Sequence, residues 1–219
     1  MLIVFSDTHL THHWFNPKKF RYLANIIRSA DQVAIVGDFW DGMRCSFDQF
    51  IQSPWKALFP LLKSKDAIYL YGNHDLEEWC DERVNRFSTL QAEAVDITVG
   101  TFNLRLEHGH RIAPDPITKN PKLLNIPMIG WADYIFTSAI PMVLFGDRWA
   151  KVSGRVPTHL MRERAKWASA NGQWLICGHS HSAQVDPAIR YANSGFVGSG
   201  WAKYLRVDEY SIDLINARF

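Results

Sequence analysis

Five short apolar runs of this 219-residue chain each end in side chains that bind metals or carry protons. The polar ends read Ser-Asp-Thr-His at 6–9, Gly-Asp-Phe-Trp-Asp at 37–41, Gly-Asn-His-Asp at 72–75, Glu-His-Gly-His at 107–110 and Gly-His-Ser-His at 178–181. One Gly-Asn-His-Asp segment alone is equally well explained as a turn, because Gly, Asn and Asp all favour turns. Five such endings in one chain instead predict a single shared site.

The residue types at these endings indicate which chemistry the site performs. Carboxylate oxygens, imidazole nitrogens and an amide carbonyl suit borderline divalent ions such as Mn²⁺, Fe²⁺, Zn²⁺ or Co²⁺. The three cysteines have no Cys-x-x-Cys spacing, which argues against a structural zinc site and against a disulfide framework. Seven candidate ligands are too many for one tetrahedral ion, but they suit two ions that share a bridging carboxylate.

A parallel sheet is the scaffold that brings such endings together. Runs at 2–5, 32–36 and 67–71, apolar at every position except Gln32, predict strands that are buried on both faces. Helical spacing over 18–30 and a proline-opened segment at 54–62 predict helices between these strands. The resulting β-α-β-α-β order predicts a parallel sheet, in which ligands bind at the carboxyl ends of the strands.

The second half of the chain predicts a second sheet. We expect a hairpin over 94–106, then a helix from an N-cap at Thr158 to Asn171, and a buried strand at 174–177. Further strands that would close the second sheet are expected at 189–192, 202–207 and 210–215. These elements predict one α/β domain, residues 1–219, with two packed sheets.

The segment at about 111–157 differs from the rest, because it is irregular, apolar and contains several prolines. We expect it to form a cap-like insertion that covers the site and receives a lipid or another apolar group. The alternative is a cap that only packs on its own domain. The stretch 126–146 is long enough to span a bilayer, but Asp133 and two prolines interrupt it, so peripheral membrane contact is favoured over insertion. Its large apolar residues, together with Trp149, are Ile126, Met128, Ile129, Trp131, Tyr134, Ile135, Phe136, Met142, Leu144 and Phe145.

Composition restricts the class of protein further. An apolar content of 47% with 21% charged residues describes an ordinary soluble globular protein, and a net charge of +2 provides no basic field for nucleic acid. The first ten residues lack the pattern of a signal peptide, and the cysteine content fits a reducing compartment. We therefore expect a cytoplasmic protein, with peripheral membrane contact as an additional possibility and no indication of its oligomeric state.

The motifs D-x-H, G-D-x-x-D, G-N-H-D, H-G-H and G-H-x-H occur in this order between Asp7 and His181, and together they resemble the calcineurin-like metallophosphoesterase superfamily. The resemblance implies a two-sheet β-sandwich flanked by helices, a four-layer αββα fold. It also implies two divalent metal ions, with Mn²⁺ as the first choice and Fe²⁺, Zn²⁺, Co²⁺ or Ni²⁺ as alternatives. Residue by residue, it implies Asp7, His9 and His181 on the first ion, Asn73, His108 and His179 on the second, and Asp38 bridging both.

The same resemblance implies the reaction and the remaining site residues. A hydroxide between the two metals would hydrolyse a phosphodiester or pyrophosphate bond by attacking phosphorus in line. His74 would stabilise the phosphate charge and assist the leaving oxygen, and Asp75 would orient His74. Asp41 would hydrogen-bond a metal ligand, and His110 would contact the substrate or support a ligand.

Longer stretches resemble the branch related to UDP-2,3-diacylglucosamine diphosphatases, among them GDFWDGM and YANSGFVGSGWAKYLRVDEYSIDLI. This branch makes a nucleotide-lipid the first candidate substrate. Members of it often have Arg in place of His74 and H-G-D in place of residues 108–110, so a cyclic-nucleotide or nucleic-acid phosphodiesterase is the alternative. A non-catalytic scaffold of the same fold is less favoured, because none of the expected ligands is missing.

Overall fold

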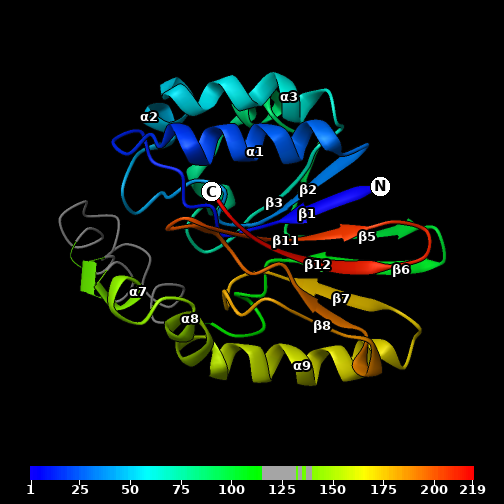
Figure 1. Ribbon diagram of the computed structural model, residues 1–219. Coiled ribbons are helices and arrows are strands. Elements are labelled where there is room, and N and C mark those ends of the chain that lie inside the picture. The colour runs from blue at the N-terminus through cyan, green and yellow to red at the C-terminus, as the bar shows by residue number, and fades with distance from the viewer. Residues whose placement is uncertain (115–131, 133–134, 137–139) are drawn as a thin grey trace.

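Two β-sheets packed face to face form the centre of the molecule, and helices cover the outer face of each sheet (Figure 1). This computed structural model describes residues 1–114, 132, 135–136 and 140–219. The layers follow one another as α, β, β, α, so the expected two-sheet sandwich flanked by helices is confirmed.

The first sheet has seven strands, in the order β10-β11-β1-β2-β3-β4 with β12 paired to β11. Its strands are β1 (Leu2–Phe5), β2 (Gln32–Val36), β3 (Ile68–Leu70), β4 (Leu90–Ala92), β10 (Val197–Gly198), β11 (Trp201–Val207) and β12 (Ile212–Arg218). Strands β1 to β4 are parallel to one another, whereas β11 runs antiparallel to β1. The carboxyl ends of β1, β2 and β3 therefore lie at the same edge of the sheet.

The second sheet has five strands in the order β5-β6-β7-β9-β8. Its strands are β5 (Ala94–Val99), β6 (Phe102–Glu107), β7 (Trp174–Cys177), β8 (Gln184–Asp186) and β9 (Tyr191–Asn193). The expected hairpin is present as β5 and β6, which pair antiparallel across a two-residue connection. Because β6, β7 and β9 are parallel, the ends of β6 and β7 share one edge.

Helices cover the first sheet on one side of the sandwich and α9 covers the second sheet on the other (Figure 1). The helices over the first sheet are α1 (Pro17–Ser29), α2 (Phe47–Gln52), the 3₁₀ helix Pro54–Leu58 and α3 (Phe59–Lys63). Helix α9 (Arg155–Ser169) follows α7 (Ile140–Phe145) and α8 (Asp147–Ser153) in the chain. Short 3₁₀ helices also occur at Glu77–Trp79, Glu82–Arg86 and Pro187–Ile189.

Alternating side chains of β1 show how the layers are held together. Leu2 and Val4 pack in the apolar layer between the two sheets, whereas Ile3 and Phe5 pack in the layer beneath α1 to α3. Successive side chains of a strand point to opposite faces, so a strand between two apolar layers must be apolar at every position. A third, smaller apolar layer joins α9 to the second sheet and includes Met161.

Two expectations about the second half of the chain are wrong. Helix α9 begins at Arg155 rather than after Thr158, because Pro157 lies in its first turn, where a missing N–H is tolerated. The Thr158 hydroxyl donates to Ser180 Oγ (3.0 Å) and does not cap the helix. The strands expected at 202–207 and 210–215 exist as β11 and β12, but they extend the first sheet, because β11 pairs with β1 and β12 pairs with β11.

The expected insertion at about 111–157 is described only in part. Its described residues include α7 and α8, where the sequence predicted irregular structure. Residues 115–131, 133–134 and 137–139, which include five of the apolar residues named above, lie outside the described part of the chain. None of the helices in the described part is both long and apolar enough to cross a bilayer.

Candidate metal centre

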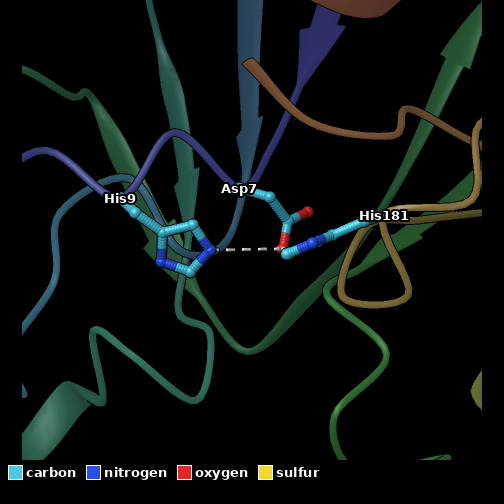
Figure 2. Close-up of side chains that lie close together, drawn as sticks. All are labelled: Asp7, His9 and His181. Atoms are coloured by element: carbon cyan, nitrogen blue, oxygen red, sulfur yellow. Dashed lines mark ion pairs between the residues drawn. The ribbon is translucent and has the colours of Figure 1, made fainter. Parts of the chain in front are cut away.

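Asp7 lies at the centre of the first group of candidate ligands. Its Oδ1 atom is 3.1 Å from Nε2 of His181 and 4.0 Å from Nε2 of His9. Figure 2 shows the two imidazole rings on either side of the Asp7 carboxylate, His9 from the loop after β1 and His181 from the loop after β7. The ends of strands from both sheets therefore contribute to one cluster.

A second group of candidate ligands surrounds Asn73. Its Oδ1 atom is 3.0 Å from Nε2 of His108 and 3.0 Å from Nδ1 of His179. Asp38 connects the two groups, because its Oδ2 atom lies 3.3 Å from Nε2 of His108 and 3.8 Å from Nε2 of His9. The structure thus brings all seven candidate ligands together at the carboxyl ends of five strands.

The backbone at this site adopts a conformation that residues with side chains rarely take. Five of the seven candidate ligands have positive φ, namely Asp7 (52°), His9 (45°), Asp38 (54°), His179 (62°) and His181 (57°). Each such residue costs of order 1–3 kcal/mol, and strain of this kind concentrates at functional sites. The clustering of strain at five candidate ligands is therefore an indication of function that is independent of their side-chain chemistry.

Asp75 holds the loops of the site through their backbone. Its Oδ1 accepts hydrogen bonds from the N–H groups of Asp38 (2.9 Å) and Gly72 (2.7 Å), and its Oδ2 accepts one from Phe39 (2.7 Å). We expected Asp75 to orient the His74 ring. The structure shows its carboxylate directed to the backbone instead, so Asp75 joins the loop after β2 to the loop after β3.

Asp41 is the carboxylate that faces His74. Its Oδ1 lies 3.4 Å from Nδ1 of His74, and its Oδ2 lies 3.6 Å from Nδ1 of His9. The rings of His9 and His74 are in edge contact, with centroids 4.5 Å apart. Asp41 therefore lies beside the ring of the candidate ligand His9, as we expected. It also lies beside the ring of the candidate catalytic residue His74.

His110 is buried beside the second group of candidate ligands. Its ring centroid is 5.5 Å from that of His108, and its Nε2 lies 4.0 Å from Oε2 of Glu93. Burial, with a further contribution from the charge of His108, lowers the pKa of His110 to about 3. His110 is thus a neutral ring near neutral pH, in a position to support a ligand or contact a substrate.

The charges of the cluster are strongly coupled. Burial opposes ionisation of Asp38, but the neighbouring histidines, His108 foremost, hold its pKa well below its usual range. Burial likewise opposes protonation of His108, but Asp38 outweighs burial and raises the pKa of His108 to about 10. A site that stabilises positive charge so close to Asp38 is electrostatically suited to cations.

The donor atoms fit divalent cations. Oδ1 of Asp7 and Nδ1 of His9 are buried, and no residue in the described part of the chain gives either of them a hydrogen bond. Three sets of ligand atoms within 4.8 Å of one another could each hold an ion: Asp7, His9 and His181; His9, Asp38 and His74; and Asp7, Asp38 and His108. A charged oxygen and imidazole nitrogens are the donors that Mn²⁺, Fe²⁺ and Zn²⁺ accept.

Two side chains of the site were not recognised from the sequence. Arg44 is buried and its guanidinium contacts the Asp41 carboxylate at 2.6 Å, a pairing whose only sequence signal is the spacing of three residues. Glu93 lies between His110 and Arg111, and it forms a 2.7 Å ion pair with Arg111. No sequence pattern distinguishes Glu93 from glutamates that lie on the protein surface.

The two packed sheets, with an Asp-His cluster at the ends of their strands, are the architecture of a metallophosphoesterase. The chain belongs to the calcineurin-like phosphoesterase family, whose family model matches residues 1–183. All five motifs lie within the matched residues. No curated protein matches the chain by sequence.

Similar solved structures align with nearly all of the chain at low sequence identity. An archaeal phosphodiesterase is 15% identical, with 100% of this chain and 99% of that chain covered and a TM-score of 0.51. Vps29 from Entamoeba histolytica is 14% identical, with 100% and 98% covered and a TM-score of 0.45. The phosphoesterase YfcE from E. coli is 15% identical, with 98% and 97% covered and a TM-score of 0.44. The first of these likenesses supports the fold, and none of them assigns a substrate.

Proposed function

We propose that the protein hydrolyses a phosphodiester or pyrophosphate bond and uses two divalent metal ions, with Mn²⁺ as the first candidate. The observation that carries this proposal is the convergence of seven candidate ligand side chains, Asp38 among them, from five strand ends. Asp7, His9 and His181 would hold one ion, and Asn73, His108 and His179 the other, with Asp38 between them. When bound, such ions neutralise phosphate oxygens and supply an activated water.

The protein's own groups would then position the phosphate and its leaving oxygen. Nδ1 of His74 faces Asp41, which leaves its Nε2 for the leaving oxygen. Burial opposes protonation of the His74 ring, but the Asp38 and Asp41 carboxylates outweigh burial and raise the pKa of His74 to about 9. A protonated His74 can donate a proton to the leaving oxygen as general acid.

For the substrate, we propose a lipid-linked nucleotide diphosphate such as UDP-2,3-diacylglucosamine, cleaved by a cytoplasmic protein in peripheral contact with a membrane. The support is the exposure of both apolar and basic residues on α7 to α9. The exposed apolar residues are Leu144, Phe145, Val152 and Val156, and the exposed basic residues are Arg148, Lys151 and Arg155. Apolar side chains beside basic ones suit an anionic lipid surface.

The alternative substrate class is a cyclic nucleotide or a nucleic acid. A hollow of about 460 Å³ beside the site is lined by Leu76, Glu77, Glu78, Glu93 and Arg111. Three glutamates against one arginine make this hollow negative, which disfavours a polyanionic chain.

A metal-by-substrate panel tests the proposed activity. Protein stripped of metal would be assayed with and without Mn²⁺ on bis-p-nitrophenyl phosphate, p-nitrophenyl phosphate, diacylated UDP-sugar in detergent, a cyclic nucleotide and single-stranded DNA. We expect Mn²⁺-dependent activity that Asp38→Asn abolishes and that the matched control Asp213→Asn, in an exposed ion pair, retains. Inactivity of the wild type on every substrate with Mn²⁺ present would contradict the proposal.

A second comparison tests the substrate class. Replacing Leu144 and Phe145 with Ser should lower the rate on diacylated UDP-sugar but not on bis-p-nitrophenyl phosphate. Tyr210→Ser is the control, because Tyr210 is 83% exposed and lies outside α7 to α9. Faster cleavage of the cyclic nucleotide or DNA than of the lipid would favour the alternative class.

A further inference from the structure

Arg44 is a buried cation behind the proposed metal centre. Only 5% of the residue is exposed. Its Nε donates to Oδ2 of Asp41 at 2.6 Å, and its Nη2 lies 2.6 Å from the same oxygen. Nη2 also donates to the backbone carbonyl of His9 at 3.3 Å. One guanidinium thus contacts both the side chain behind His9 and the backbone of His9 itself.

The Asp41 carboxylate divides its two oxygens between two histidines. Oδ1 accepts the N–H of Met43 at 3.1 Å and lies 3.4 Å from Nδ1 of His74. Oδ2 accepts from Arg44 and lies 3.6 Å from Nδ1 of His9. Because one rigid carboxylate faces both rings, any rotation of Asp41 moves its contacts with His9 and His74 together.

The backbone of His9 also needs external support. Its φ of 45° is unfavourable for a residue with a side chain. Arg44 holds the His9 carbonyl, and the ammonium of Lys19 donates to the preceding carbonyl, that of Thr8. The side chains of Arg44 and Lys19 therefore hold successive carbonyls of the loop that presents His9.

Net stability alone does not explain a buried Arg–Asp pair. The desolvation of two buried charges offsets most of their attraction, so apolar residues of similar volume are often equally stable in such places. Arginine does offer a planar fork that bonds an acceptor in a fixed direction, which lysine lacks. The geometry of Arg44 therefore points to positioning.

We propose that Arg44 is a positioning residue that holds the Asp41 carboxylate and the His9 carbonyl, so that His9 is presented to the first metal and His74 to the leaving oxygen. This inference rests on the proposed function, and it adds a residue outside the five motifs to the site. Arg44 itself touches neither the metal nor the substrate in this role.

The test compares Arg44→Lys and Arg44→Met with the wild type. Mn²⁺ binding would be measured by isothermal titration calorimetry, folding by circular dichroism, and kcat and KM on bis-p-nitrophenyl phosphate. We expect folded Arg44→Lys protein whose Mn²⁺ affinity at one site falls by about 10- to 100-fold, the usual effect of losing a residue that orients a ligand. We expect kcat to fall and KM to change little. Arg206→Met, which breaks a 2.9 Å Arg–Asp pair at the surface, is the matched control and should behave as wild type.

A double-mutant cycle separates positioning from a general effect on the fold. If Arg44 acts through Asp41, Arg44→Met combined with Asp41→Asn should lose less Mn²⁺ affinity than the product of the two single losses. The cycle can also be run with Arg44→Lys if Arg44→Met does not fold. Wild-type Mn²⁺ affinity and kcat in a folded Arg44→Lys variant, or fully multiplicative losses, would overturn the inference while leaving the proposed function intact. A wild type that neither binds Mn²⁺ nor hydrolyses the phosphodiester would overturn both.

Discussion

Oδ1 of Asp41 lies 3.4 Å from Nδ1 of His74, although the two residues belong to loops after different strands. Asp75, which is adjacent to His74 in the sequence, binds three backbone N–H groups instead. The carboxylate that faces the candidate catalytic histidine is therefore one that only the fold brings to it. This pairing is the basis of the first prediction.

Replacing His74 with Gln should lower kcat by about 10²- to 10⁴-fold, the usual contribution of a general acid. Two bound Mn²⁺ ions per chain should remain, because His74 is proposed to act on the leaving oxygen. Activity and metal content would be measured on the same sample, with His159→Gln on the exposed surface of α9 as the control. Loss of one ion from the His74→Gln protein would instead make His74 a ligand, a role that its proximity to His9 and Asp38 allows.

Gly72 and Gly178 leave space for the ligand carboxylates. A Cβ atom at Gly72 would clash with the Asp38 carboxylate and lie 2.7 Å from the Asp38 nitrogen, and one at Gly178 would lie 2.6 Å from Oδ2 of Asp7. Gly72→Ala and Gly178→Ala should therefore weaken Mn²⁺ binding and activity. Gly198→Ala is the control, since its Cβ would meet only Phe196 at 3.9 Å. Wild-type Mn²⁺ affinity in both site variants would show that these carboxylates are not ligands.

Lys19 should make the stability of the protein depend on pH. Burial, followed by the charge of Arg44, lowers the pKa of Lys19 to about 7, whereas a lysine in an unfolded chain titrates near 10.4. Between these values the unfolded chain binds more protons than the folded protein, so this residue makes the free energy of unfolding rise with pH. In Lys19→Met, the rise between pH 7 and 9.5 should be smaller than in the wild type.

Urea unfolding at several pH values measures this difference. Lys18→Met is the matched control, because Lys18 is the exposed neighbour of Lys19 on α1 and its loss should leave the wild-type slope unchanged. Equal slopes in the wild type and Lys19→Met would show that Lys19 titrates outside this range in the folded protein.

The candidate ligands were predictable from the sequence because their signal is local. Asp7, Asp38 and Asn73 each follow a short apolar run, and parallel strands place such endings at one edge by topology alone. The partners of these ligands were not predictable in the same way. Asp41 faces His74 because two loops lie side by side, which residue spacing does not predict. The spacing of three residues between Asp41 and Arg44 does not by itself identify their ion pair.

Most strands of the fold were also predictable from the sequence, but the sheet to which each strand belongs was not. The runs at 2–5, 33–36 and 174–177 are apolar throughout, so each marks a strand between two apolar layers. The strands β11 and β12 were expected in the wrong sheet, because an apolar pattern shows that a strand is buried but does not show its neighbour. The helix start at Arg155 was missed for a comparable reason, since a Pro in the first turn resembles a boundary.

The count of Mn²⁺ ions bound per chain tests the central claim most directly. Elemental analysis of the wild type and of Asp38→Asn, after metal removal, incubation with Mn²⁺ and desalting, gives this number together with the protein concentration. The account predicts two ions in the wild type and fewer in folded Asp38→Asn, because Asp38 lies between both groups of ligands. A folded wild type that retains no Mn²⁺, Fe²⁺, Zn²⁺, Co²⁺ or Ni²⁺, or an Asp38→Asn variant that retains two ions, would contradict it.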